Sequence, residues 1–243
     1  NTFQYCTNLA SVEIPSGITQ FYGTFRNSGV RTVTLTGTAQ ADFYGSSGTS
    51  VARAWTDGTT GITIRYPSTG TAPTRTGTSF TATVQQYMVA GATFTSGDFT
   101  YTVNAGSSTV TLTAIAAASL SGDITVPNSV TYSATTYTVT HLGDAFKNQG
   151  AKTSGITSIT LPNTVTNFTG TGTFQNCTGL TSIHLPSALT AGYEANQLTN
   201  TFQGCSNLAS VEIPSGITKF YGTFRNSAVR TVTLKSTSQA DFY

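Results

Sequence analysis

The chain has 243 residues and a mass of 25.3 kDa, enough for one or two domains with a sizeable core. Only 8% of the residues are charged and the net charge is +2; the basic residues are spread along the chain, which excludes the concentrated Lys/Arg face that nucleic-acid binding requires. No stretch approaches the roughly 20 apolar residues of a membrane-spanning helix. Abundant Thr, Ser and Gly favour strands and turns over helices.

Residues 1–44 return almost unchanged as residues 200–243, a shift of 199 positions. These segments are called the first copy and the second copy below. Large aliphatic residues and Phe are unchanged, and the seven differences are Tyr5/Gly204, Thr7/Ser206, Gln20/Lys219, Gly29/Ala228, Thr36/Lys235, Gly37/Ser236 and Ala39/Ser238. Because tightly packed positions tolerate little change, the differing positions are expected to lie at the surface. The chain begins and ends within a copy, so we expect it to be a piece of a longer protein.

A shorter repeat lies within the long one and follows the template F-x2-C-x2-L-x2-(I/V)-x-(I/L)-P. The template is complete at residues 174–186 and again 28 positions later at residues 202–214. We call each unit, from its Phe onward, a rung. Rungs, some of them looser or shortened, begin at six phenylalanines: Phe3, Phe25, Phe146, Phe174, Phe202 and Phe224.

Such a period is typical of a solenoid, in which one short strand per turn points alternate apolar residues inward. In the rung strand at residues 156–161, Ile156, Ile159 and Leu161 are expected to face the core, whereas Ser158 and Thr160 face out. No rung is expected to fold alone, because each buries its apolar face only against a neighbour. The predicted inward-facing column comprises Phe3, Cys6, Leu9, Phe146, Phe174, Cys177, Leu180, Ile183, Phe202, Cys205, Leu208 and Val211.

In chain order, four segments are predicted. Residues 1–66 form the C-terminal part of one module, and its last, irregular rung contains Trp55. Residues 67–80 are a linker, indicated by their Pro, Gly, Ser and Thr content. Residues 81–145 form a β-rich cap of the next module, because short runs alternate Thr with Val, Ile, Leu and Tyr. Residues 146–243 are the rungs of that module, truncated.

The rungs, together with the sequence YTVTHLGDAF at residues 137–146 that leads into them, resemble the BspA-type leucine-rich repeats of surface and secreted proteins. The resemblance covers most of residues 1–66 and 97–243. It implies a mainly β leucine-rich-repeat solenoid with a small β-rich capping segment, arranged as tandem modules. It also implies an extracellular or cell-surface location, since family members are mostly adhesins or extracellular proteins. The sequence departs from the family at residues 148–154, which lengthen one rung, and at the shortened rung of Phe224.

Cys6, Cys177 and Cys205 occupy one template position, so stacking places Cys177 and Cys205 on adjacent rungs. Buried free thiols are the favoured interpretation. A disulfide between neighbouring rungs is the alternative, although it needs Cβ atoms about 3.8 Å apart and rungs are spaced at about 4.8 Å. Zinc is disfavoured because the further ligands are missing. We therefore predict no metal and no cofactor.

Catalytic arrangements are weak in this sequence. His141 and Asp144 lie three residues apart, but no G-x-S-x-G motif accompanies them. The acidic residues Glu13, Glu194 and Glu212 each stand alone, unlike the paired carboxylates of a glycosidase. We predict that the protein is not an enzyme.

Other candidate sites also have simpler interpretations. Asp98 and Asp123 follow Ser-Gly and indicate turns rather than calcium loops. Asn167 and Asn176 fit the glycosylation triplet, which a Thr-rich chain produces readily. Aromatic residues that suit either core packing or contact between modules are Tyr22, Phe43, Tyr44, Tyr193, Tyr221, Phe242 and Tyr243.

The sequence and the resemblance together predict a non-enzymatic extracellular structural or adhesive repeat protein, a segment of a long tandem array or self-assembling filament. Its expected partner is itself, through end-to-end or module–module contacts. A surface binding module for a host or matrix protein or a glycan is the alternative. Neither nucleic acid nor a membrane span is expected in this segment.

Overall fold

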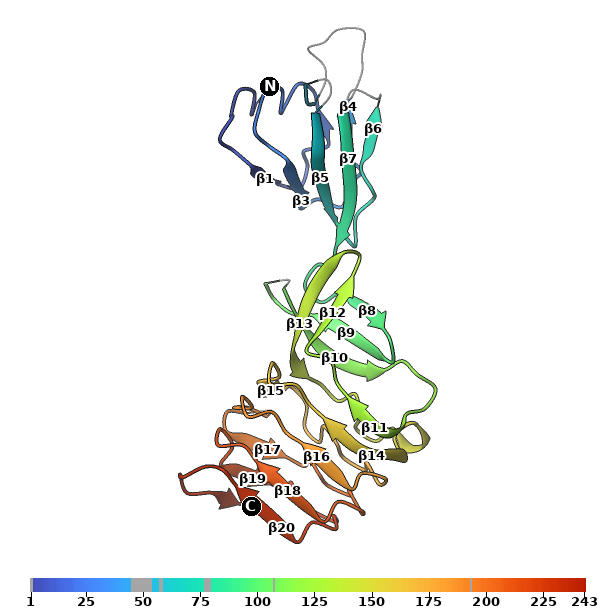
Figure 1. The fold of residues 1–243 in the computed structure, drawn as a ribbon, viewed down its shortest axis with the longest axis vertical. Coiled ribbons are helices and arrows are strands. Elements are labelled where there is room, and N and C mark those ends of the chain that lie inside the picture. The colour runs from blue at the N-terminus through green and yellow to red at the C-terminus, as the bar shows by residue number, and fades with distance from the viewer. Residues whose placement is uncertain (1, 45–53, 57–58, 77–79, 107, 193) are drawn as a thin grey trace. The chain divides into compact units, whose positions relative to one another are not determined.

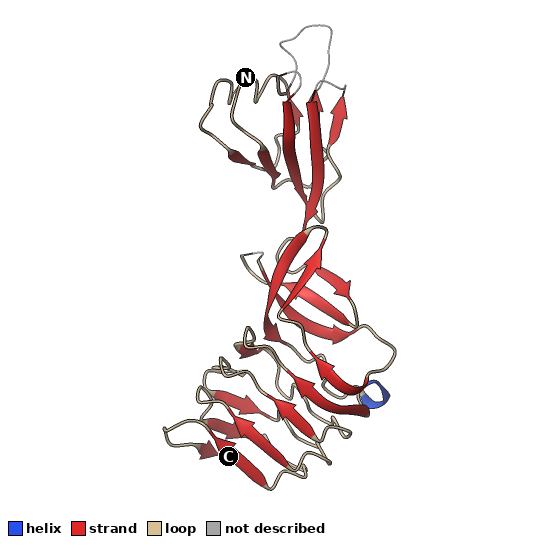
Figure 2. Cartoon of the chain, in the orientation of Figure 1, coloured by secondary structure: helices blue, strands red, loops and turns tan. Residues whose placement is uncertain are grey.

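The computed structural model describes residues 2–44, 54–56, 59–76, 80–106, 108–192 and 194–243 (Figure 1). Two compact units make up the chain: unit 1 comprises residues 1–89 with 133–135, and unit 2 comprises residues 90–132 with 136–243. Strands form nearly all of the regular structure in the described residues, beside one short 3-10 helix, η2 (Gly150–Lys152) (Figure 2). The mainly β fold predicted from the sequence is confirmed.

Unit 1 holds two parallel sheets formed by successive rungs. One sheet has the order β1 (Ser11–Ile14), β3 (Thr32–Leu35), β5 (Thr59–Pro67) and β7 (Phe80–Tyr87). The other has the order β2 (Gln20–Phe21), β4 (Asp42–Tyr44) and β6 (Thr74–Thr76). Each strand pairs with the equivalent strand of the next rung, as when Ile14 pairs with Leu35 and Val33 with Ile64. This is the solenoid connection that the rung template predicts.

The end of unit 1 differs from the linker expected at residues 67–80. Pro67 closes β5, Phe80 opens β7, and between them β6 pairs in parallel with β4. Strand β7, which lies in the stretch expected to begin the next module's cap, pairs with β5 along residues 59–67. The boundary between the units therefore falls after residue 89. Pro and Gly here mark tight turns within a paired rung, because β6 is only three residues long and turns flank it.

Unit 2 begins with a mixed sheet, ordered β12-β13-β10-β9-β8, in which β15 also pairs with β13. Its strands are β8 (Thr93–Ser96), β9 (Phe99–Val103), β10 (Thr109–Ile115), β12 (Ser129–Tyr132), β13 (Thr135–Leu142) and β15 (Asn167–Phe168). Strands β8, β9 and β10 are antiparallel neighbours, whereas β10 and β13 are parallel. The antiparallel part precedes the rungs, as the β-rich lead-in predicts.

The rungs of unit 2 follow as three parallel sheets. They are β11 (Ser121–Thr125) with β14 (Gly155–Thr160) and β16 (Ser182–His184), then β18 (Ser210–Ile213) with β20 (Thr231–Leu234), and finally β17 (Gln197–Thr199) with β19 (Lys219–Tyr221) and β21 (Asp241–Phe242). Ile156 and Ile159 of β14, and Leu161 directly after it, are at most 2% exposed, as expected. The register shift opposite Gly122 and Asp123 explains why two residues, not one, separate the first two buried isoleucines.

In each rung, the residue two positions after the initial Phe has a left-handed backbone conformation. Asn148, Asn176 and Asn226 adopt φ of 53°, 60° and 54° there, and Gly204 adopts 73°. Asn and Gly are the residues that accept this conformation at least cost. In the rung of Phe3 the position holds Tyr5, with φ of 63°, where the second copy has Gly204, so this rung of the first copy carries backbone strain that its counterpart lacks.

Candidate functional site

A column of phenylalanine rings runs through the rungs of unit 2. The ring centroids of Phe146 and Phe174 are 5.6 Å apart, those of Phe174 and Phe202 are 5.8 Å apart, and Phe224 continues the column 6.0 Å beyond Phe202. The first three side chains are fully buried. Each ring therefore packs against the next rung, and aromatic contact adds to burial in holding the rungs together.

The two cysteines of unit 2 repeat one contact. Cys177 Sγ donates to the carbonyl oxygen of Phe146 at 3.4 Å, and Cys205 Sγ donates to that of Phe174 at 3.1 Å. Both thiols are free and fully buried. Burial raises the pKa of each to about 12; for Cys177 the neighbouring Cys205 adds to the increase. Since the thiolate is the reactive form, these cysteines have a packing role rather than a chemical one.

The other predicted column residues of unit 2 lie mostly in the core. Leu180 and Leu208 are fully buried and Val211 is 4% exposed, whereas Ile183 is half-buried. Ile183 belongs to β16, and β18 of the next rung lies in a different sheet. β16 and β18 do not pair, and Ile183 lines a groove together with Glu212 of β18 and Lys235. This groove leaves one side of Ile183 uncovered.

The first copy places the same template residues differently. Phe3, Cys6 and Leu9 are half-buried, whereas their counterparts in the second copy are fully buried. Phe3 stacks on Phe25 with a centroid distance of 5.6 Å, and no described residue of unit 1 forms a rung on its other side. Ile18 is likewise 53% exposed. One face of the first copy is therefore open.

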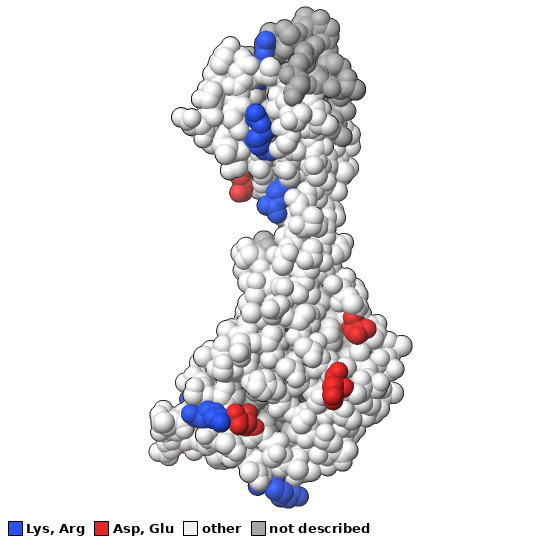
Figure 3. Space-filling view, in the orientation of Figure 1, with Lys and Arg blue, Asp and Glu red and all other residues white. Residues whose placement is uncertain are grey.

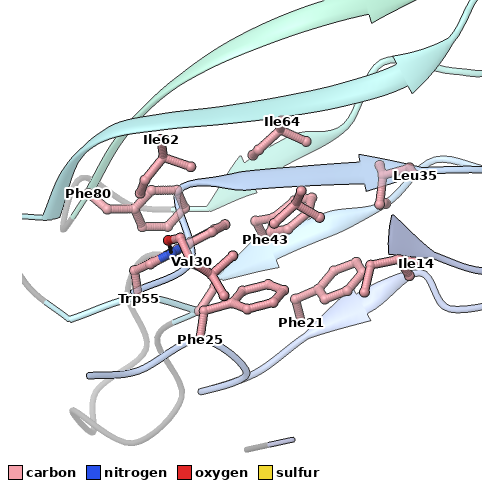
Figure 4. Packing of buried hydrophobic residues seen from close by; sticks show 13 residues of the cluster. Ile14, Phe21, Phe25, Val30, Leu35, Phe43, Trp55, Ile62, Ile64 and Phe80 are labelled. Carbon is pink, nitrogen blue, oxygen red and sulfur yellow. Dashed lines mark hydrogen bonds between the residues drawn. The ribbon is translucent and has the colours of Figure 1, made fainter. Parts of the chain in front are cut away.

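The opposite face of the first copy is covered by residues 54–56, 59–76 and 80–87, which we call the terminal cap. Figure 4 shows Trp55 lying against Phe25 and Phe43, with Phe80 beyond it. Trp55 is fully buried, with ring distances of 4.7 Å to Phe25 and 5.0 Å to Phe80. Ile62 and Ile64 of β5 complete the contact.

Hydrogen bonds attach the terminal cap to the main chain of the first copy. Trp55 Nε1 donates to the carbonyl oxygen of Val30 at 2.9 Å, and Phe25 N donates to that of Ala54 at 2.8 Å. Farther along, Thr74 N donates to the oxygen of Ala41 at 2.8 Å. The sequence analysis assigned Trp55 only to an irregular rung and divided the cap among three segments, residues 1–66, 67–80 and 81–145. The alternation of Phe80, Ala82 and Val84 along one strand was the available signal.

The second copy leaves open the face that the terminal cap covers in the first. Phe242 is 57% exposed, whereas its counterpart Phe43 is fully buried. The strands β20 and β21 are sheet edges in the described residues. The other residues of this surface are half-buried; together with Phe242 they form what we call the end face: Phe224, Val229, Val232, Leu234, Ala240 and Phe242.

The remaining aromatic candidates divide between core and surface. Tyr221 and Tyr243 stack with centroids 4.2 Å apart, and Tyr243 is 66% exposed. Tyr22, the counterpart of Tyr221, is also exposed. Tyr44 lies in β4, and Tyr193 lies outside the described residues.

The outer face of the rung strands is polar and rich in hydroxyl groups. Pairing aligns Ser158 with Ser182 and, on the next strands, Ser210 with Thr231, all pointing away from the core. Charged side chains are few and scattered over the surface seen in Figure 3. A groove of ≈ 470 Å³ lies on this side, lined by Asn163, Ile183, His184, Leu185, Ser187, Glu212, Pro214, Ser215 and Lys235. Within it Lys235 Nζ and Glu212 Oε1 form an ion pair at 3.1 Å.

His141 and Asp144 do not form a catalytic pair. His141 Nδ1 lies 2.8 Å from Thr140 Oγ1 and 3.3 Å from Asn104 Nδ2, and burial lowers the pKa of the imidazole. Asp144 instead forms an ion pair with Lys147 at 3.3 Å. Both residues thus have structural partners.

The other polar candidates also have local contacts. Asp123 Oδ1 accepts hydrogen bonds from Ser158 at 2.6 Å and Thr157 at 3.2 Å, and Asn176 donates to Asn148 Oδ1 at 2.7 Å. Across the part of the chain that the structure describes, no three His, Cys, Asp or Glu side chains gather as metal ligands. The described helical structure includes nothing long and apolar enough to cross a membrane.

Several solved structures are similar to this chain, and three of them are described here. A leucine-rich repeat protein of Bacteroides capillosus is 29% identical with a TM-score of 0.48, and the match covers 59% of this chain and 98% of that one. A leucine rich cell surface protein of Faecalibacterium prausnitzii is 27% identical (TM-score 0.42; 60% of this chain, 43% of that one). A leucine-rich repeat protein of Bacteroides ovatus is 22% identical (TM-score 0.45; 58% and 37%).

No curated protein matches the chain. The family model described as BspA type leucine rich repeat region matches six times, over residues 1–45 and 119–240. These residues are more than half of the chain, and they contain the Phe column, the cysteine positions and most of the paired rung strands described above. The chain therefore belongs to the family of BspA-type leucine-rich repeat proteins.

Proposed function

We propose that this chain is a segment of a non-enzymatic, extracellular or cell-surface protein whose modules, joined in a long tandem array or assembled into a filament, provide an extended structural or adhesive surface. The observation that carries the proposal is the recurrence of the first copy as the second copy. The terminal cap continues from the first copy, and the rungs of residues 146–199 lead into the second. Overlaying the copies joins these parts into one block of 199 residues.

This block has the physical requirements of a stable repeat module. A solenoid must cover both ends of its stack, because open apolar ends and unpaired strand edges cause aggregation. The mixed sheet of residues 93–142 precedes the first rung, and the terminal cap follows the last one. The side chains of His141, Asp144, Asp123, Cys177 and Cys205 all make structural contacts, which supports a role in binding or support rather than catalysis.

Electron microscopy of the intact protein from its natural source tests the proposal. Elongated particles or filaments with one density maximum per 199-residue block are expected. Compact isolated particles would contradict it. The enzyme alternative is tested separately by incubating purified protein with polysaccharides, where any hydrolysis lost on denaturation would overturn the non-enzymatic assignment.

A surface binding module for a host protein or a glycan is the second candidate. The groove beside Ile183, with hydroxyl groups and the Glu212–Lys235 ion pair at its wall, favours it. Screening the purified chain against glycans and matrix proteins tests this function. Saturable binding that is weakened by His184→Ala in the groove would support it over a purely structural role.

A further inference from the structure

The groove of unit 2 lies within the stack of rungs, where two neighbouring rung strands do not pair. β16 pairs with β14 on one side, and β18 pairs with β20 on the other, but β16 and β18 belong to different sheets. Rungs therefore stand on both sides of the groove, and its opening follows from this break in pairing. It has a volume of ≈ 470 Å³, within the range of small-molecule sites.

Four successive rungs contribute side chains to the groove. Asn163, Ser187 and Ser215 each follow the Pro of the rung template, so they hold one equivalent position in three rungs. Lys235 comes from the fourth rung. The groove thus runs across the rungs, whose phenylalanine rings follow one another at 5.6, 5.8 and 6.0 Å. This repeat is similar to the length that one hexose unit adds to an extended polysaccharide.

The groove offers hydrogen-bonding groups beside apolar surface. Asn163 Oδ1 accepts hydrogen bonds from Ser187 N at 3.0 Å and from Ser187 Oγ at 3.2 Å. These contacts hold the amide group by its oxygen, while its nitrogen still carries two donor hydrogens. Ile183 lines the same groove and is half-buried. A ring with hydroxyl groups at its edge and C–H groups on its face matches this combination.

A pair of opposite charges also lines the groove. Lys235 Nζ and Glu212 Oε1 are 3.1 Å apart, and their side chains are 53% and 62% exposed. The carboxylate repels an anion and the ammonium repels a cation, so the pair favours a neutral ligand. Two adjacent hydroxyl groups can bind both partners, because one donates to the carboxylate while the other accepts from the ammonium. Such charge-assisted hydrogen bonds are stronger than those between neutral groups.

We propose that this groove binds a neutral oligosaccharide that lies across the rungs. Two adjacent hydroxyl groups bind Glu212 and Lys235, a further hydroxyl accepts from the Asn163 amide, and a sugar ring packs on Ile183. Addition of a peptide strand fits the groove less well, because β16 is only three residues long and polar side chains outnumber apolar ones in the lining.

The two copies supply the substitutions that test this site. Lys235 stands where the first copy has Thr36, so Lys235→Thr removes the partner of Glu212 with a residue that the equivalent rung already contains. Lys219, which replaces Gln20 of the first copy, provides the matched control. It is exposed on β19 and does not line the groove, so Lys219→Gln removes the same charge elsewhere.

The inference rests on the second candidate function, a surface binding module, and names the ligand class of its groove. Saturable binding of a matrix protein without binding of any oligosaccharide would overturn the inference and leave the binding function standing. Absence of both kinds of binding would overturn the two together. The two failures are therefore distinguishable.

An array of neutral oligosaccharides built from hexoses and N-acetylhexosamines, printed beside their sialylated and sulfated forms, tests the proposal with the full chain. Saturable binding is expected to the neutral forms, and weaker binding to the charged ones. Titration calorimetry with the neutral oligosaccharide that binds most tightly on the array then compares the variants. Lys235→Thr and Glu212→Gln are each expected to weaken binding roughly tenfold, because each removes a charge-assisted hydrogen bond.

The control and the site variants together locate the binding. Weaker binding by Lys235→Thr and Glu212→Gln, with unchanged binding by Lys219→Gln, supports the proposal. It is overturned if no neutral oligosaccharide binds saturably, if only the charged forms bind, or if the two groove variants bind as well as the parent chain. An equal loss from Lys219→Gln also overturns it, since a general effect of charge would then explain the result. Urea unfolding of each variant confirms that it is folded.

Discussion

The first copy and the second copy differ at seven positions, yet they bury opposite faces. In the first copy Phe43 is fully buried and Ile18 is 53% exposed; in the second, Phe242 is 57% exposed and Ile217 is fully buried. Nearly identical residues thus take their environment from what stacks beside them. The comparison teaches that a rung is stabilised by its neighbours more than by its own sequence, as expected for a quasi-one-dimensional fold.

The largest expected difference in stability is between the replacement of Phe43 and the replacement of its counterpart Phe242. Phe43→Ala is expected to lower the free energy of unfolding of unit 1 by about 3–5 kcal/mol, the range for a buried Phe, because Phe43 stacks on Phe21 at 4.4 Å beneath Trp55. Phe242→Ala is expected to cost unit 2 about 1 kcal/mol or less, since more than half of the ring is exposed. Urea unfolding, followed by Trp55 fluorescence for unit 1 and by circular dichroism for the whole chain, measures both. Equal losses of unfolding free energy from the two substitutions would contradict the claim that the two copies are stabilised on opposite faces.

At the start of each copy the order is reversed, and the larger loss of stability is expected in the second copy. Phe202→Ala removes a ring held between Phe174 and Phe224, and a loss of about 3–5 kcal/mol is expected for unit 2. Phe3→Ala removes a half-buried ring with Phe25 as its stacking partner, and about 1–2 kcal/mol is expected for unit 1. The same urea titrations apply. A larger loss from Phe3→Ala than from Phe202→Ala would show that neighbouring rungs do not determine stability.

At the left-handed position that holds Tyr5 in the first copy and Gly204 in the second, each residue can be replaced by that of the other copy. Gly204→Tyr is expected to destabilise unit 2 by about 2–3 kcal/mol, because a Cβ there meets the side chain of Asn176 and φ is 73°. Tyr5→Gly is expected to stabilise unit 1 by about 1 kcal/mol through relief of backbone strain. Thermal unfolding of both variants checks these signs. Stabilisation by Gly204→Tyr would contradict the proposed strain.

The accessibility of the thiols also differs between the two copies. At pH 8, a disulfide reagent is expected to modify Cys6, which is half-buried, before Cys177 and Cys205, which are fully buried. Mass spectrometry of digested protein identifies the modified site. Modification of all three at one rate would contradict the buried column.

The buried thiols also predict a dependence of stability on pH. Their pKa rises from 9.0 to about 12 in the folded chain, so the unfolded chain loses these protons first. Their stabilising contribution is complete below pH 9 and is lost as the pH rises toward 12. Replacing both residues with Ala should flatten this part of the stability profile of unit 2, measured by urea titration at several pH values.

The smallest expected change in stability comes from a substitution at a surface position where the two copies differ. Lys235, which replaces Thr36 of the first copy, pairs with Glu212 while both side chains remain more than half exposed. Exposed ion pairs contribute little, so Lys235→Thr is expected to change the stability of unit 2 by about 0.5 kcal/mol or less. A loss of several kcal/mol in a urea titration would indicate that the groove has a larger structural role.

The periodicity of the sequence was sufficient to predict the rungs, but it was not sufficient to predict what covers the two ends of each stack of rungs. The F-x2-C-x2-L spacing predicted which side chains align, and the structure places Phe146, Phe174 and Phe202 in one column. It could not predict that Phe3 and Phe202 differ in burial, because identical residues carry no information about what covers them. Nor did it predict the half-buried Ile183, which follows from a gap between sheets rather than from the template.

The terminal cap was misread because local composition and pairing point to different structures. Pro67, Gly70 and Pro73 are typical of a linker, but β6 beyond them completes a rung by pairing with β4. Such pairing is a long-range contact that short turn signals do not encode. Trp55 similarly lacks a template position, and its role is visible only once it lies against Phe25 and Phe43.

Hydrogen exchange of the two copies in the intact chain, read by mass spectrometry, tests most directly whether neighbours determine the order of a rung. In the first copy β3, which lies between β1 and β5, is expected to exchange more slowly than the edge strand β1. In the second copy β18 and β20 form a two-stranded sheet, and β18, whose apolar side chains are buried, is expected to exchange more slowly than β20, whose apolar side chains are half-buried. The same protection order in both copies, set by sequence position alone, would contradict the account.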